Sequence, residues 1–172
     1  LFIGQLFTTT AMGAYESVIA NAVFLSLFIP MIISSGGNSG SQAATLIIRA
    51  LSTDDIDMSE WFKVFWRELL SGLMLGCIMA VIGFIVILGW GYLVSEGGMS
   101  QELILSAAVV GLSLIGVVLW GNLSGSMLPF VLSKMGLDPA VTSAPFVSTL
   151  SDVTGIIIYF SIAIALLEGV VL

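Results

Sequence analysis

The stretch LLSGLMLGCIMAVIGFIVILGWGYLVS at residues 69–95 contains no charged side chain. About 20 consecutive apolar residues carry a helix across the hydrocarbon core of a bilayer. Backbone amide and carbonyl groups in lipid must find partners within the segment, and a helix supplies them. Because the run is solidly apolar rather than alternating, it predicts a membrane helix and argues against a β-barrel.

The composition of the whole chain agrees with this stretch. Of its 172 residues, 58% are hydrophobic and 9% are charged, and the mean hydropathy is +1.16. A soluble domain carries about 25% charged residues, so an ordinary soluble enzyme is excluded, as is a disordered chain. The net charge of −7 argues against a nucleic-acid partner. One cysteine, Cys77, and no histidine leave no internal disulfide and no His/Cys cluster for zinc or copper.

Charge-poor runs divide the chain into predicted membrane helices. We expect an all-α, polytopic membrane domain over residues 1–172, with five transmembrane helices at about 1–13, 17–35, 63–94, 102–133 and 139–167. The first is short, and the chain opens at Leu1 in apolar sequence without Met, which is expected of a piece of a longer protein.

The positions of the charged residues predict how the helices are oriented across the membrane. In a five-span chain all four cations fall on one side: Arg49, Lys63, Arg67 and Lys134. The acidic residues at the other side are Glu16, Glu96, Glu102 and Glu168. Cytoplasmic loops of membrane proteins are enriched in Lys and Arg. We therefore expect a multi-pass plasma-membrane protein with a cytoplasmic N-terminus and an external C-terminus.

Asp152 is the acidic residue expected deepest in the bilayer. Asp138 and Pro139 are favourable cap and first-turn residues. A helix that starts there reaches Asp152 after about 21 Å, at about 1.5 Å per residue. A carboxylate at that depth is costly unless it is paired or hydrated, so it is a candidate functional group. Three interpretations stay open: a structural Asp bonded to Ser, Thr or a cation; a cation pathway; and a proton relay.

Other oxygen donors share the predicted face of Asp152. Ser148 and Thr149 lie one turn before it, and Pro145 lies two turns before it. Proline has no N–H, so it frees a backbone carbonyl one turn earlier in the helix. This face is therefore rich in oxygen and is expected to line a polar path.

Residues 34–42, SSGGNSGSQ, interrupt an otherwise apolar segment. A polar, glycine-rich break at membrane depth is tolerated only inside protein or against a water-filled cavity, where such breaks form ion sites. The alternative is an interfacial loop, because a helix from Ser17 has crossed most of the core by Ser35. Asn38 in this segment is a candidate pore-lining residue.

Further candidates lie near the other helices. Asn122, within GNLSGSMLP at 121–129, is expected to line the same cavity as Asp152. Glu68 is expected either to pair with Lys63 or Arg67 or to join a hydrated metal shell. Two GxxxG motifs, Gly72/Gly76 and Gly121/Gly125, indicate close helix packing. The acidic loop 52–60 is expected to be a solvated linker in which Ser59 caps the next helix. The alternative is a surface that weakly attracts cations or docks another domain.

The available ligands are carboxylate, amide, hydroxyl and carbonyl oxygens, which suit hard cations. One Asp per chain suits a hydrated ion such as Mg²⁺ better than a calcium cage of many carboxylates. The chemistry of these ligands by itself indicates a hard cation and does not determine the charge of that cation.

The chain resembles the membrane domain of the MgtE family of magnesium channels and transporters. The resemblance rests on GGNSGSQAATLIIRAL at 36–51, GNLSGSMLPFVLSKMGLDPAV at 121–141 and PFVSTLSDVTGIIIYFSIA at 145–163. It implies five membrane helices per subunit and a homodimer in a lipid bilayer with a central cation pore. It also implies Mg²⁺ as the transported and bound ion, and cytoplasmic regulatory domains that precede the first span.

The resemblance also implies roles for particular residues. Asp152 would hold hydrated Mg²⁺, and the main-chain oxygen of Ser148 would face the same ion. Ala144 stands where some members have Asn, which removes one amide contact to ion-bound water. A second group of metal-holding residues towards the cytoplasm would comprise Gly37, Ser41 and Glu68, with Asn in some members where this chain has Ser41.

We therefore expect a divalent-cation channel or transporter that brings Mg²⁺ into the cytoplasm and has no catalytic chemistry. Two alternatives stay open. One is a proton- or sodium-coupled cation carrier, and the other is a non-transporting membrane scaffold in which Asp152 is structural.

Overall fold

The computed structural model describes residues 2–94 and 100–168, without the side chains of Val94 and residues 141–144. Throughout these residues the secondary structure is helical, with no strand, so the all-α prediction is confirmed. The elements are α1 (Phe2–Ala14), α2 (Glu16–Asn21), α3 (Val23–Ser26), α4 (Ile29–Ser52), a 3₁₀ turn η1 (Met58–Glu60), α5 (Trp61–Val94), α6 (Gln101–Lys134) and α7 (Pro139–Leu167).

Among the described residues, four segments are long and apolar enough to cross a membrane: Val23–Ser52, Met58–Leu93, Gln101–Lys134 and Pro145–Leu167. The 13-residue α1 is shorter than a bilayer requires. The chain therefore has a multi-pass membrane fold with four candidate spans, and the fifth span remains a prediction.

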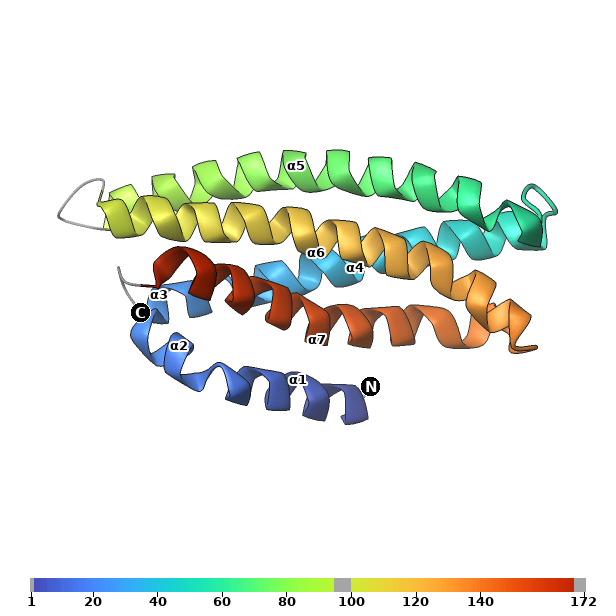
Figure 1. Ribbon diagram of the computed structural model, residues 1–172, viewed down its shortest axis with the longest axis horizontal. Helices are drawn as coiled ribbons and strands as arrows, with labels where there is room; N and C mark the ends of the chain where they lie inside the picture. Colours follow the sequence, from blue (N-terminus) through green and yellow to red (C-terminus); the bar gives the residue numbers. More distant parts are fainter. Residues whose placement is uncertain (1, 95–99, 169–172) are drawn as a thin grey trace.

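The long helices run side by side, each antiparallel to the next in sequence (Figure 1). Helix α6 packs against α4, α5 and α7, and α1 lies along α7. The C-terminal ends of α4 and α6 meet the N-terminal end of α5 at one end of the bundle (Figure 1). Arg49, Lys63 and Lys134 are therefore gathered at that end, whereas Glu102 and Glu168 lie at the opposite end.

Glycines bring α4 and α6 into backbone contact. A β-carbon at Gly121 would overlap the Gly36 carbonyl oxygen, and one at Gly125 would overlap that of Gly40. On the other side of α6, a β-carbon at Gly76 of α5 would lie 3.0 Å from the Cα of Ile115. Small residues allow such close approach in membranes, where dispersion contacts drive helix packing. The predicted packing role of the GxxxG motifs is confirmed.

The predicted break at residues 34–42 is wrong, because α4 is continuous from Ile29 to Ser52. The glycines there form the surface that packs against the neighbouring helices. Polar side chains there make hydrogen bonds to groups one turn earlier in α4. The Ser35 hydroxyl donates to the Met31 carbonyl at 2.7 Å, and Asn38 Nδ2 donates to Ser34 Oγ at 3.0 Å.

The real interruption lies earlier, so the expected span 17–35 is also wrong. Helix α2 ends at Asn21, α3 is a single turn, and α4 begins again at Ile29 with Pro30 in its first turn. Proline favours that position because the first N–H groups of a helix have no intrahelical partner. The Tyr159 hydroxyl of α7 donates to the Leu25 carbonyl at 2.8 Å and so anchors the interrupted segment.

Candidate functional site

Asp152 lies where α7 packs against α4, directly beside a glycine. A β-carbon at Gly37 would lie 3.7 Å from Asp152 Oδ1 and 3.5 Å from Ser148 Oγ. Because Gly37 has no side chain, the carboxylate and the Ser148 hydroxyl adjoin the α4 backbone. The structure thus brings together Gly37, Ser148 and Asp152.

Within the part of the chain that the structure describes, the Asp152 carboxylate has no protein partner. It is half-buried, and among the described residues it makes neither a hydrogen bond nor an ion pair. The structure therefore shows neither the Ser/Thr bond nor the cation pair of the structural interpretation. A carboxylate within a membrane helix needs a counter-charge, a proton or water. This group is thus open to a hydrated cation.

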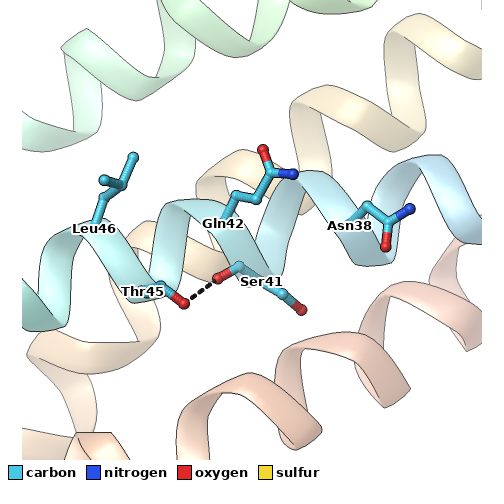
Figure 2. A pocket seen from close by; sticks show the side chains of 5 residues that line it. All are labelled: Asn38, Ser41, Gln42, Thr45 and Leu46. Carbon is cyan, nitrogen blue, oxygen red and sulfur yellow. Dashed lines mark hydrogen bonds between the residues drawn. The ribbon is translucent and has the colours of Figure 1, made fainter.

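A polar surface groove of about 470 Å³ runs along α4. Its lining residues are Asn38, Ser41, Gln42, Thr45 and Leu46 (Figure 2). In Figure 2, Ser41 and Thr45 project towards the side on which α7 runs, and the Thr45 hydroxyl donates to the Ser41 carbonyl at 2.8 Å. Neither Gly37 nor Asp152 lines the groove, but Ser41, which does, lies one helical turn after Gly37, so the groove begins about one turn from Asp152.

The sequence analysis missed Gln42 and Thr45 as groove residues. Their signal was present, because Asn38, Ser41 and Thr45 follow the i, i+3, i+7 spacing of one helical face. Interpreting residues 34–42 as a break concealed that periodicity.

The other α7 candidates lie in different surroundings. A β-carbon at Gly4 of α1 would overlap the Thr149 side chain, so Thr149 forms the α1–α7 contact. Pro145 is exposed one turn before it, and α7 continues through it. Ala144 belongs to α7, but its side chain lies outside the described residues.

Asn122 and Glu68 form a second polar cluster on another side of α4. Asn122 Nδ2 donates to Glu68 Oε2 at 3.4 Å, and Asn122 Oδ1 accepts from the Ser39 hydroxyl. The Asn122 side chain is 6% exposed and lies between α4 and α5, away from the groove. Ser39 was missed by the sequence analysis because the break interpretation gave it no helical face.

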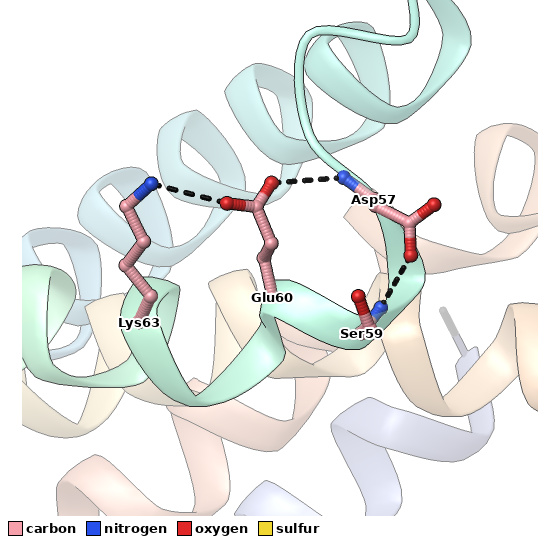
Figure 3. Close-up of polar contacts among 4 residues, drawn as sticks. All are labelled: Asp57, Ser59, Glu60 and Lys63. Carbon is pink, nitrogen blue, oxygen red and sulfur yellow. Dashed lines mark hydrogen bonds and ion pairs between the residues drawn. The ribbon is translucent and has the colours of Figure 1, made fainter.

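Lys63 does not pair with Glu68. Its Nζ bonds Glu60 Oε1 at 3.0 Å, and Glu60 Oε2 accepts from the Asp57 amide (Figure 3). The Asp57 carboxylate accepts from the Ser59 amide at 2.8 Å, which completes a capping box. The cap is thus Asp57, not Ser59 as predicted. The Ser59 amide bond lowers the pKa of Asp57 below its ordinary value.

Within the described residues, no group of three or more His, Cys, Asp or Glu side chains is arranged to hold a metal ion. A single carboxylate among neutral oxygens does not strip the hydration shell from a hard cation, whereas it can contact an ion that keeps its water.

These features define a helical multi-pass membrane protein that carries an unpaired carboxylate beside a polar groove. The profile of the MgtE family, described as a divalent cation transporter, matches residues 29–162. The chain belongs to this family, whose members are transport proteins and not enzymes.

Three relatives share sequence over nearly the whole chain, and each is named magnesium transporter MgtE. The protein from Thermus thermophilus is 42% identical over 170 residues, which cover 99% of this chain and 35% of that protein. The protein from Enterococcus faecalis is 34% identical over 95% of this chain and 34% of its own length. The protein from Bacillus subtilis is 31% identical over 98% of this chain and 35% of its own length. The chain thus spans about a third of these relatives.

Proposed function

We propose that this chain is the ion-conducting membrane part of a magnesium transporter and that hydrated Mg²⁺ passes beside Asp152. The observation that carries the proposal is the unpaired carboxylate of Asp152 next to Gly37 and the α4 groove. The names of the three relatives support Mg²⁺ as the ion. Mg²⁺ dehydrates reluctantly, so one carboxylate and several retained waters suit it.

The pore lies on the two-fold axis of a homodimer. Asn38 and Thr45 are exposed on the surface of the protomer, although α4 is a candidate membrane span. Polar groups at membrane depth normally face a bundle interior or water rather than lipid. A two-fold axis beside α4 and α7 covers this face and brings two copies of Asp152 together, since isologous dimers repeat one surface patch. Two facing carboxylates repel unless a cation lies between them.

The remaining candidates act around this path. The main-chain oxygen of Ser148 faces the same ion as Asp152. Ala144 provides no side-chain amide to contact the ion-bound water. Gly37 and Ser41 line the cytoplasmic half, and Glu68, held by Asn122 on the α5 side of α4, lies near its inner end. Asn38 and Pro145 border the path, Thr149 holds α7 against α1, and Asn122 holds Glu68.

Orientation follows from the charges. The end that carries Arg49, Lys63, Arg67 and Lys134 is cytoplasmic. α1 is part of a first span, so five helices cross the membrane, with the N-terminus inside and the C-terminus outside. Regulatory domains of the full-length protein lie on the cytoplasmic side. The inside-negative potential then favours divalent entry by about 2.3 kcal/mol per charge per 100 mV.

The test is Mg²⁺ uptake by the full-length protein in proteoliposomes at clamped voltage. We expect uptake that follows the voltage and the Mg²⁺ gradient, together with single-channel currents. Uptake that instead follows an imposed proton or sodium gradient would indicate a coupled carrier. No uptake by a correctly folded dimer would leave only a scaffold role.

A further inference from the structure

A pocket of about 280 Å³ opens beside the helix interruption between α2 and α3, at the end of the bundle opposite the four cations. One wall is the chain around the interruption, and the other is the first two turns of α6. The lining residues with polar side chains are Asn21, Ser100, Glu102 and Ser106.

Ser106 is an unusual member of this lining. Its side chain is 8% exposed, and it makes no hydrogen bond among the described residues. Its Oγ is not fully enclosed, since Ser151 Oγ is the fully buried side-chain oxygen that lacks a partner among the described residues. The next buried serine on α6, Ser113, instead donates to the Val109 carbonyl at 2.6 Å. Because Ser106 lines the pocket, its hydroxyl is available to a bound molecule.

The interruption supplies further acceptors. The helical hydrogen bonds end with the Ala22 amide on the Val18 carbonyl and resume with the Leu25 amide on the Ala22 carbonyl. Between them, the carbonyls of residues 19–21 receive no backbone amide from the described residues. Asn21 lines the pocket at this point, so its main-chain oxygen, which no backbone amide of the described residues bonds, lies beside the pocket.

Charge decides the kind of ligand. Glu102 is exposed at the rim, one turn before Ser106, and it has no ion-pair partner in the described chain. The α6 N-terminus would attract an anion, but Ser100 Oγ already accepts from the Leu103 amide at 3.1 Å. A carboxylate among amide, hydroxyl and carbonyl oxygens selects a hard cation.

The volume fits an ion that keeps its water. Six waters at about 30 Å³ each occupy about 180 Å³, which is less than the pocket provides. One carboxylate with neutral oxygens gives weak, water-mediated binding, which allows the ion to leave again.

We propose that this pocket is a low-affinity site for a hydrated divalent cation, in which Glu102 supplies the charge and Ser106 and Asn21 contact the ion-bound water. Resting on the proposed function and orientation, the site lies at the external end and loads the transport path.

The test combines two measurements on the full-length protein. In crystals soaked with Mn²⁺, we expect anomalous density beside Glu102 that is lost in Glu102→Gln and weakened in Ser106→Ala. In proteoliposomes, we expect Glu102→Gln to raise the half-saturating external Mg²⁺ concentration about three- to tenfold with maximal flux unchanged.

Matched variants separate a site from general surface charge. Glu16→Gln and Glu168→Gln remove exposed charges at the same end and should change half-saturation much less. Ser113→Ala is the control for Ser106→Ala, because its hydroxyl is already bonded within the helix.

Absence of Mn²⁺ density beside Glu102, density that persists in Glu102→Gln, or equal flux effects of the three glutamate variants would overturn the proposal. If the wild type carried no Mg²⁺, the proposed transport function would fail, while the Mn²⁺ density would still decide whether the pocket binds a cation.

Discussion

Gly37 on α4 leaves room for Asp152 on α7: a β-carbon at position 37 would lie 3.7 Å from the Asp152 Oδ1 atom. That distance is ordinary van der Waals contact, so an added methyl group fits without moving the helices. It would, however, occupy space in which water can reach the carboxylate. In the proposed function, the glycine would therefore keep the acidic group open to a hydrated ion.

Gly37→Ala is expected to separate transport from folding. Alanine is better than glycine in a helix by up to about 1 kcal/mol, so thermal stability should be unchanged or higher. Mg²⁺ flux should fall several-fold because the methyl group displaces hydration at Asp152. Stability and uptake are measured on the same preparation, with Gly89→Ala as the control, since a β-carbon there meets nothing within 4 Å. Unchanged flux in Gly37→Ala would show that position 37 does not border the path.

Gly125→Ala is expected to destabilise the bundle. Its β-carbon would overlap the Gly40 carbonyl oxygen and lie 2.8 Å from the Gly40 Cα. Because both are backbone atoms, they cannot move aside unless the helix shifts. Overpacking of this kind costs about 1–3 kcal/mol. Thermal unfolding in detergent should show a lower midpoint than Gly89→Ala. Equal midpoints would contradict the close α4–α6 contact.

Asn122→Ala should weaken the link between three helices. It removes the donor to Glu68 Oε2 and the acceptor for the Ser39 hydroxyl, so both lose a partner. Membrane side-chain hydrogen bonds average about 0.6 kcal/mol, so losing two should cost about 1 kcal/mol. Combining it with Glu68→Ala in a double-mutant cycle should give non-additive losses. Strict additivity would mean that Asn122 and Glu68 are not coupled.

The capping box should respond to pH. Because the pKa of Asp57 is lower in the folded chain, its ionised form stabilises the cap above the ordinary value of 3.8, and this support is lost as the pH falls through the lower, folded pKa. Protection from hydrogen exchange at the start of α5, taken relative to the intrinsic exchange rate at each pH, should fall on acidification in wild type. In Asp57→Asn this protection should already be lower at neutral pH and should change less. Asp54→Asn, outside the box, is the control.

The ends of the long helices were predictable because charge-free runs and caps are local signals. Expected spans 63–94, 102–133 and 139–167 correspond closely to α5, α6 and α7. The Asp138–Pro139 cap, where Asp138 accepts from the Ala140 amide at 2.9 Å, placed the start of α7 correctly.

Residues 34–42 were misjudged because their conformation depends on a distant partner. Glycine and serine favour turns locally, whereas here Gly36 and Gly40 meet the α6 backbone, and that contact selects the helix.

Parts of the candidate site likewise could not be predicted from the sequence. The pairing of Asp152 with Ser148 followed from the family resemblance, which assigned Gly37 to a second group with Ser41 and Glu68. The proximity of Gly37 to Asp152 and Ser148 is seen only in the structure. Which helix each side chain meets is a tertiary property. Thr149 shares a helical face with Asp152, yet it packs against Gly4 of α1. Periodicity along α7 alone does not contain that information.

The central claim is that Mg²⁺ passes beside Asp152, and Mg²⁺ flux through Asp152→Ala in the full-length protein tests it most directly. We expect selective Mg²⁺ uptake into proteoliposomes to be abolished, while the variant still folds and elutes as a dimer. Full flux with unchanged ion preference in that variant would contradict the account.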